Sequence, residues 1–252
     1  MISVDPIKAF SDNYIWCLSN PEGEAWVVDP GDAAPVEEHL RQRDLTLQGV
    51  LITHHHFDHV GGVASLTKQR DIRVVGPQTA TPEINEPVAD GDRITLLGSE
   101  FDVIAVPGHT LDHIAYYGNT LLFCGDTLFA GGCGRLFEGT PEQMHASLAR
   151  ISSLPGATRV YCAHEYTQAN LAFAAAVEPD NTALQSRIQK VEQLRQQGLP
   201  TVPSQLADEL ATNPFLRADQ PSVRDSAEEY ASIRLSDDIG VFAEVRRWKD
   251  NF

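Results

Sequence analysis

Basic residues, long apolar runs and cysteines are all scarce in this 252-residue chain. Its 19 lysines and arginines face 35 aspartates and glutamates, and the net charge of −16 argues against a nucleic-acid partner, because phosphate contacts require a basic surface. No segment approaches the ~20 consecutive apolar residues that cross a bilayer, and residues 1–6 carry no signal-peptide pattern. We therefore expect a cytoplasmic protein without membrane contact.

Cysteine occurs at only four positions, and no two of them form a C-x-x-C pair. Cys17, Cys124 and Cys162 lie inside apolar runs, where a free thiol behaves as a small core residue, while Cys133 lies between glycines. This scattered usage is typical of a reducing cytosol.

The first two-thirds of the chain alternate short strands with helices. The predicted strands are Tyr14–Ser19, Ala25–Asp29, Val50–Ile52, Ile72–Val75, Phe101–Val106, Leu121–Cys124 and Val160–Ala163. Helical patterns cover Pro35–Arg43, Val60–Lys68 and Pro141–Ser152, and Asn20–Glu24 is typical of a hairpin loop. Interleaved strands, helices and hairpins predict a layered α/β domain with mixed sheets.

Beyond Glu165 strand signals disappear and helical patterns take over. They cover Ala169–Val177, Asn181–Gln197, Pro221–Arg234 and Val241–Trp248. We therefore expect residues 166–252 to form a helical appendage.

The most informative motif is Thr53–His59, which holds four histidines and an aspartate directly after an apolar strand. Neutral imidazole and carboxylate groups together suit a borderline cation such as Zn²⁺. The spacing of His54, His56, Asp58 and His59 is too dense for one metal to use easily. It predicts two metals side by side, and His55 points away from His54 and His56 if the chain there is extended.

Three further ligand-type residues each follow an apolar strand: His109, Asp126 and His164. Strand ends at one edge of a layered sheet converge, and ligand sites in α/β folds collect there. Taken singly, each residue also fits a turn, a helix cap or a surface position, but these explanations do not account for a ligand after every strand. His113 competes with His109, which we prefer because it stands at the strand exit.

With these motifs in view, the sequence resembles the metallo-β-lactamase-fold superfamily and, more narrowly, the glyoxalase II (hydroxyacylglutathione hydrolase) family. The broad resemblance rests on Val28–Gly31, Thr53–Gly62, Pro107–Thr110, Gly125-Asp126 and His164. The narrower one rests on Phe10-x-Asp12-Asn13-Tyr14, Gly125–Phe129, Gly132–Arg135, Glu138–Thr140, His164–Thr167 and Asn213–Arg217.

The resemblance implies a four-layer αβ/βα sandwich over residues 1–165, the catalytic domain, and a helical glutathione-binding domain over residues 166–252. It implies two divalent metals, with zinc expected and iron or manganese as alternatives. His54, His56 and His109 would hold one metal and Asp58, His59 and His164 the other, with Asp126 bridging. Asp29 would support a ligand, and Asp58 would position a hydroxide that lies between the metals.

The resemblance also implies that Arg135, Tyr166 and Arg217 bind the glutathione end of the substrate. Two residues depart from the pattern: Phe137 stands where some relatives have a tyrosine, and Gln220 near where some have a lysine. Both departures remove a polar contact to glutathione and leave the metal ligands intact.

The implied activity is that of a monomeric thioester hydrolase which cleaves S-D-lactoylglutathione to glutathione and D-lactate, the second step of methylglyoxal detoxification. One alternative is a glutathione persulfide dioxygenase, which shares the fold and the first metal's ligands but uses a single iron. Another is a lactonase or β-lactamase of the same superfamily.

Overall fold

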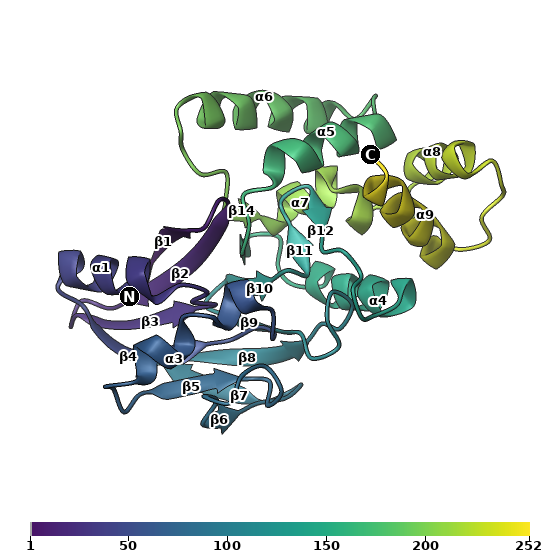
Figure 1. Cartoon of the computed structure of the whole chain (residues 1–252). Coiled ribbons are helices and arrows are strands. Elements are labelled where there is room, and N and C mark those ends of the chain that lie inside the picture. Colours follow the sequence, from purple (N-terminus) through teal and green to yellow (C-terminus); the bar gives the residue numbers. More distant parts are fainter. Residues whose placement is uncertain (1) are drawn as a thin grey trace. The chain divides into compact units, whose positions relative to one another are not determined.

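The computed structural model describes residues 2–252 (Figure 1). The chain divides into two compact units, one formed by the residues up to 105 together with 112–125, and the other by residues 106–111 and 126–252. Among the described residues, no helix has both the length and the apolar character that crossing a bilayer requires.

The first unit contains a six-stranded mixed sheet in the order β1-β2-β3-β4-β5-β6. Its strands are β1 (Ser3–Ala9), β2 (Asn13–Ser19), β3 (Glu24–Val28), β4 (Thr46–Leu51), β5 (Arg73–Gly76) and β6 (Glu86–Pro87). The first three are antiparallel, which confirms the predicted hairpin, and β3 to β6 run parallel. Because β3 and β4 are parallel neighbours, Asp29 and Thr53 leave the sheet at the same edge.

Three helices belong to this unit: α1 (Ala33–Arg43), α2 (Phe57–Val60) and α3 (Val63–Thr67). The Asp32 side chain accepts a hydrogen bond from the backbone N–H of Ala34 and so caps α1. Apolar residues of α1 and α3 share one buried cluster with β1 to β5, which holds the parallel edge in place.

The first unit also contains an antiparallel meander. It comprises β7 (Arg93–Leu96), β8 (Ser99–Ala105), β9 (Ile114–Gly118) and β10 (Leu121–Gly125). The buried hydroxyl of Tyr116 on β9 lies 2.7 Å from the Ile52 carbonyl oxygen and 3.2 Å from that of Val75, and so joins the meander to the parallel strands. Burial raises the Tyr116 pKa well above its ordinary value, so this hydroxyl keeps its proton.

The second unit is mainly helical. Its helices are α4 (Pro141–Ser152), α5 (Thr167–Val177), α6 (Thr182–Gln196), α7 (Leu206–Thr212), the 3₁₀ helix η1 (Pro214–Leu216), α8 (Pro221–Ala231) and α9 (Asp238–Asp250). Its strands are β11 (Leu128–Phe129), β12 (Gly132–Cys133), β13 (Arg159–Cys162) and β14 (Ser204–Gln205). The helices α5 and α6 enclose a small apolar core of Leu171, Ala174, Leu184 and Val191.

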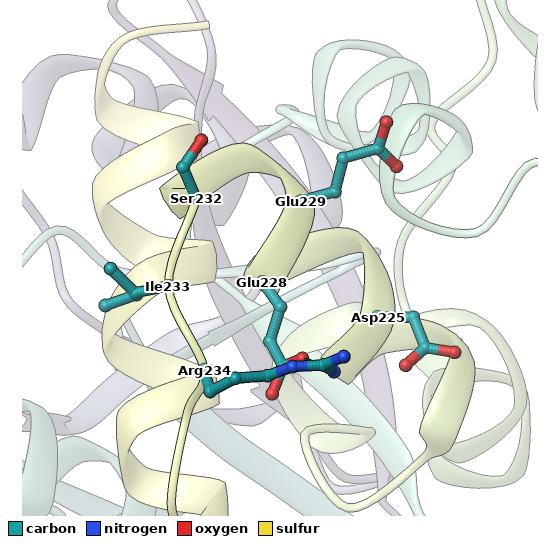
Figure 2. Close-up of a pocket in the computed structure, with 6 residues that line it drawn as sticks. All are labelled: Asp225, Glu228, Glu229, Ser232, Ile233 and Arg234. Carbon is teal, nitrogen blue, oxygen red and sulfur yellow. Dashed lines mark hydrogen bonds and ion pairs between the residues drawn. The ribbon is translucent and has the colours of Figure 1, made fainter.

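The helix α8 ends at Ala231 and is followed by its C-cap Ser232, which adopts a left-handed conformation (φ 56°). Figure 2 shows the pocket lined by residues of α8 and of the turn after it, where the Arg234 guanidinium reaches back to Glu228. The Glu228 carboxylate also accepts a hydrogen bond from the backbone N–H of Leu235 at 3.0 Å. A single carboxylate thus stabilises the turn that follows α8.

Two predictions of local structure were wrong, and several elements were not predicted. The helix expected over Val60–Lys68 is split into α2 and α3, because the backbone N–H of Gly62 donates to the Pro30 carbonyl oxygen at 2.9 Å rather than continuing the helix. Strands do not vanish beyond residue 165, since β14 pairs with β13. The strands β1, β6, β7 and β9, the hairpin β11–β12 and the helix α7 were not predicted. The domain division into 1–165 and 166–252 stays a prediction.

Candidate functional site

Within the first unit, the segment after β4 brings the predicted ligands of the histidine motif together. His54 and His59 are buried, whereas His56 and Asp58 are half-buried. His54 Nε2 lies 3.1 Å from His56 Nδ1, and Asp58 Oδ2 lies 3.4 Å from His59 Nε2. The short helix α2 begins at residue 57, and this turn is what aims Asp58 and His59 back toward His54.

The Asp29 carboxylate fixes which ring nitrogen of His59 carries the proton. Asp29 Oδ2 accepts a hydrogen bond from His59 Nδ1 at 3.0 Å, so Nε2 is the unprotonated nitrogen that can bind a metal. Asp29 itself adopts a left-handed conformation (φ 53°), which aspartate tolerates better than most residues. This conformation turns its side chain from the end of β3 toward the ligands.

Thr53 determines in the same way which ring nitrogen of His54 carries the proton. Its backbone N–H and its hydroxyl both donate to Asp29, at 2.8 and 2.7 Å. Since the single hydroxyl proton is used there, Thr53 Oγ1 can only accept from His54 Nδ1, which lies 3.0 Å away. His54 therefore also presents an unprotonated Nε2. The sequence argument missed Thr53, although its place between a strand and the first ligand is a signal.

Close packing explains why glycine precedes Asp126. Gly125 has a φ of +47°, and a Cβ atom built there would lie 2.4 Å from Thr53 Oγ1. Any side chain at this position would therefore displace the hydroxyl that orients His54.

Asp58 has a separate support. Asn13 Nδ2 donates to Asp58 Oδ2 at 2.9 Å, and Asn13 is buried at the start of β2. The Asp58 side chain is 38% exposed, so it is held on one side and accessible on the other. The motif Phe10-x-Asp12-Asn13-Tyr14 thus contains a residue with a direct contact to a predicted ligand.

Two further histidines of the first unit, His55 and His113, have different surroundings. His55 Nδ1 lies 2.9 Å from Asp112 Oδ1, and the His55 side chain is one-third exposed. His113 is buried and stacks on the His54 ring with centroids 4.5 Å apart, while its Nδ1 faces the carbonyl oxygen of Ile114 at 3.1 Å. Packing against a ligand therefore accounts for the burial of His113.

Within the second unit, Asp126 lies between two imidazoles. Asp126 Oδ2 is 3.4 Å from His109 Nε2, and Asp126 Oδ1 is 3.4 Å from His164 Nε2. Both distances exceed a normal hydrogen bond. They match the ~3.4 Å that separates two ligand atoms, each ~2.1 Å from one tetrahedral cation. The spacing of these three residues therefore fits ligands of a divalent cation.

The protonation of His109 is also determined by its neighbours. His109 Nδ1 donates to the carbonyl oxygen of Arg135 at 2.8 Å, because a carbonyl can only accept. Its Nε2, which faces Asp126, is therefore the unprotonated nitrogen. All three predicted ligands of this unit are at least nine-tenths buried.

Of the three residues predicted to bind substrate, Tyr166 packs its side chain against a predicted ligand. Its ring stacks on that of His164, with centroids 4.7 Å apart and planes 7° from parallel, and it is 38% exposed. Arg135 is more exposed still, and its Nε lies 3.3 Å from Asp250 Oδ1 on α9.

Arg217 is held in an ion pair inside the helical unit. Its Nε and Nη2 donate to the two oxygens of Glu178 at 2.7 and 3.1 Å, and Nη1 donates to the Leu210 carbonyl oxygen at 3.2 Å. A guanidinium has five N–H groups, so two remain for a further acceptor. Burial raises the Glu178 pKa, but hydrogen bonds from Arg217 and Ser222 outweigh that effect and leave the pKa below its usual value.

The two departures from the family pattern lie at the surface. Phe137 is 61% exposed and meets the His109 ring edge-on, with centroids 5.2 Å apart. Gln220 precedes α8, and its amide donates to the Asp219 carboxylate at 3.1 Å. Phe137 thus covers a ligand without offering a hydroxyl.

Comparison with known proteins decides the family. A model of the metallo-beta-lactamase superfamily matches residues 13–164, and one of the hydroxyacylglutathione hydrolase C-terminus matches residues 165–252. The chain is 54% identical over its whole length to the hydroxyacylglutathione hydrolase of Ectopseudomonas mendocina, and 51% identical to that of Photobacterium profundum, with 100% of each protein covered. This chain belongs to the hydroxyacylglutathione hydrolase family.

Solved structures agree with this family at the level of the fold. ETHE1 from Myxococcus xanthus is 24% identical with a TM-score of 0.70, and the likeness covers 98% of this chain and 90% of that one. TTHA1623, solved in a di-iron-bound form, is 32% identical with a TM-score of 0.54 over 64% of this chain and 91% of its own.

Membership of the hydroxyacylglutathione hydrolase family confirms the predicted metallo-β-lactamase fold with a C-terminal helical region. The fold and its His/Asp clusters support the binding of divalent metal. The names of the full-length relatives favour the hydrolase over the dioxygenase and the lactonase or β-lactamase alternatives.

Proposed function

We propose that this protein hydrolyses S-(2-hydroxyacyl)glutathione thioesters, with S-D-lactoylglutathione as substrate and glutathione and D-lactate as products, the second step of methylglyoxal detoxification. The observation that carries this proposal is the match to curated hydroxyacylglutathione hydrolases over the full length of both chains. A likeness confined to residues 13–164 would support the superfamily alone.

The proposed centre holds two divalent metals, with His54, His56 and His109 binding one, and Asp58, His59 and His164 the other. Asp126 would bridge them, which its two 3.4 Å distances to His109 and His164 support. We propose zinc, although iron and manganese accept the same ligands.

The bound metals would supply Lewis acidity and lower the pKa of water toward neutrality. We assign Asp58 the orientation of the attacking water, which its fixed Oδ2 and its exposed side support. The leaving thiolate has a pKa of ~8.5, so no residue need protonate it. The role of the chain is therefore to hold ligands and water in place.

The helical region, residues 166–252, is proposed to bind glutathione, with Arg135 contributed by the preceding region, residues 1–165. Arg135 and Arg217 would attract the carboxylates of this anionic substrate, which the net charge of −16 otherwise repels. Tyr166, stacked on His164, would contact the substrate between its thioester and the carboxylates of its glutathione end. We propose a monomer.

The direct test follows thiol release from S-D-lactoylglutathione, with metal content measured on the same sample. His54→Ala and His55→Ala form a matched pair, because His55 is adjacent but hydrogen-bonded to Asp112. We expect His54→Ala to lose metal and turnover together, and His55→Ala to retain both.

Two results would contradict the proposal. One is the absence of thiol release from a sample that holds two metals per chain. The other is oxygen consumption with glutathione persulfide by a sample that holds one iron, which would favour the dioxygenase.

A further inference from the structure

A single hairpin and the residues directly flanking it connect to all three predicted ligands of the second unit. The hairpin, Leu128–Cys133, consists of β11 and β12, and Asp126 lies two residues before it. The Arg135 carbonyl oxygen, two residues after it, accepts from His109 Nδ1 at 2.8 Å. The Phe129 ring packs edge-on against the His164 imidazole, with centroids 5.8 Å apart.

The base of this hairpin has little room to shift. The backbone N–H of Gly134 donates to the Thr127 carbonyl oxygen at 3.1 Å. A Cβ atom built on Gly134 would lie 2.0 Å from the Asp126 carbonyl oxygen and 3.1 Å from His109 Nδ1. Any displacement of the hairpin is therefore transmitted to both ligand residues.

The turn of the hairpin is held from the helical region. Glu209 Oε2 on α7 accepts a hydrogen bond from the backbone N–H of Gly131 at 2.8 Å and from Asn213 Nδ2 at 3.2 Å. Asn213 Nδ2 also lies 3.2 Å from the Phe129 carbonyl oxygen and 2.9 Å from that of Gly132. Asn170 on α5 donates to the Ala130 carbonyl oxygen at 3.2 Å.

Glu209 is the centre of this network and carries a charge. Glu209 and Asn213 are both 0% exposed, and the guanidinium of Arg187 on α6 pairs with the second Glu209 oxygen. Burying an ion pair is often no more stabilising than an apolar contact of the same volume, so stability alone is a weak reason for this arrangement. Fixing the position of a polar turn is a stronger one, because a buried N–H without an acceptor is costly.

We propose that Glu209 is a positioning residue for the metal ligands: it holds the β11–β12 turn and thereby sets where Asp126, His109 and His164 stand. This inference rests on the proposed function only in taking those three residues as ligands. The Glu209 carboxylate touches none of them, and acts through the hairpin backbone.

The test compares two neutral double variants. Glu209→Gln with Arg187→Met removes the ion pair but keeps an oxygen that can accept from Gly131, whereas Glu209→Met with Arg187→Met removes that acceptor as well. Zinc affinity is measured by chelator competition at a temperature where melting curves show each variant fully folded. We expect about a tenfold weaker zinc affinity for the Met/Met variant than for the Gln/Met variant. This is the lower limit of the loss seen when a residue that supports a metal ligand is removed.

A matched control lies in the same helical region. Glu228 also combines an arginine partner with a backbone N–H, and it contacts neither the hairpin nor a ligand in any interaction that we describe (Figure 2). Glu228→Gln should leave zinc affinity unchanged. If the Met/Met variant does not fold, Glu209→Asp decides, because it keeps the charge but withdraws the carboxylate by one methylene.

Equal zinc affinity in the two double variants, or wild-type affinity in Glu209→Asp where that variant decides, overturns the inference. So does a loss in Glu228→Gln as large as that in the Met/Met variant. In turnover, a positioning role predicts a lower kcat at unchanged KM. The measurement of zinc affinity does not depend on the substrate. A wild-type protein that binds zinc but does not cleave the thioester would therefore contradict the proposed function, while the variants above would still test this inference.

Discussion

Asp29 Oδ2 accepts a hydrogen bond from His59 Nδ1 at 3.0 Å, and the same oxygen accepts the hydroxyl of Thr53 at 2.7 Å. One carboxylate oxygen therefore determines the protonation of two histidines, His59 directly and His54 through Thr53. Both present Nε2 as the nitrogen that can bind a metal.

Asp29→Asn should weaken zinc binding by roughly 10- to 100-fold. The reason is that a neutral amide oxygen accepts hydrogen bonds from His59 and Thr53 more weakly than the carboxylate does. Asparagine tolerates the left-handed backbone of this position (φ 53°), so the fold should be retained. Chelator competition measures the affinity. Asp32→Asn, which keeps the α1 cap, is the control, and wild-type affinity in Asp29→Asn would show that the tautomer network is dispensable.

Asp126→Ala should reduce the metal content below two per chain and lower thiol release by at least ~100-fold. The reason is that its two oxygens face different imidazoles. Loss of a residue that only supports a metal ligand costs up to about 100-fold in activity, and loss of a ligand should cost no less. Metal analysis and turnover on one preparation check this, with Asp112→Ala as the control. A variant with two metals and full turnover would rule out the bridging assignment.

Arg217→Ala should mainly raise KM, by roughly tenfold, as expected when a charge-assisted hydrogen bond to a remote substrate group is lost. Glu178→Gln should raise KM less, because Arg217 keeps its charge but loses its bidentate partner. Steady-state kinetics with S-D-lactoylglutathione separate the two constants. Arg224→Ala, which removes another ion pair of the helical region, is the control. A fall in kcat at constant KM would place Arg217 in the chemistry.

Glu178→Gln should also change the pH dependence of stability. The Glu178 pKa is lowered in the folded protein, so its contribution is present above the unfolded pKa of about 4.5 and is lost as the pH falls through the folded pKa. At pH 7 we expect the substitution to cost roughly 3 kcal/mol, the low end for breaking a buried pair. Urea unfolding at several pH values measures this, and a difference that persists undiminished at the lowest pH would contradict it.

Seven strands of the α/β region could be predicted from its sequence, because strands such as Val50–Ile52 are apolar runs bounded by turn residues, whereas β1, β7 and β9 were missed. The hairpin β11–β12 could not, since two-residue strands show no periodicity. The break between α2 and α3 depends on a hydrogen bond from Gly62 to Pro30, a residue far away in sequence.

The grouping of the candidate ligands within each unit could also be predicted, because each of them follows an apolar strand. Their role as ligands stays a prediction. Their supports were harder to find. Nothing near Glu209 marks it, since its partner Gly131 is 78 positions away and the contact is made through backbone. Thr53 has an ordinary identity, and only its geometry shows that it orients His54.

The shared exit of β3 and β4 bears on whether this metal motif can be transplanted. Val28 pairs with Leu51, so Asp29 and Thr53 leave the sheet in a register that brings their side chains together. A designer who grafts only residues 53–59 onto another scaffold would move the imidazoles without the carboxylate that assigns their protons. A graft that keeps these hydrogen bonds must include residues 53–59 together with the ends of β3 and β4.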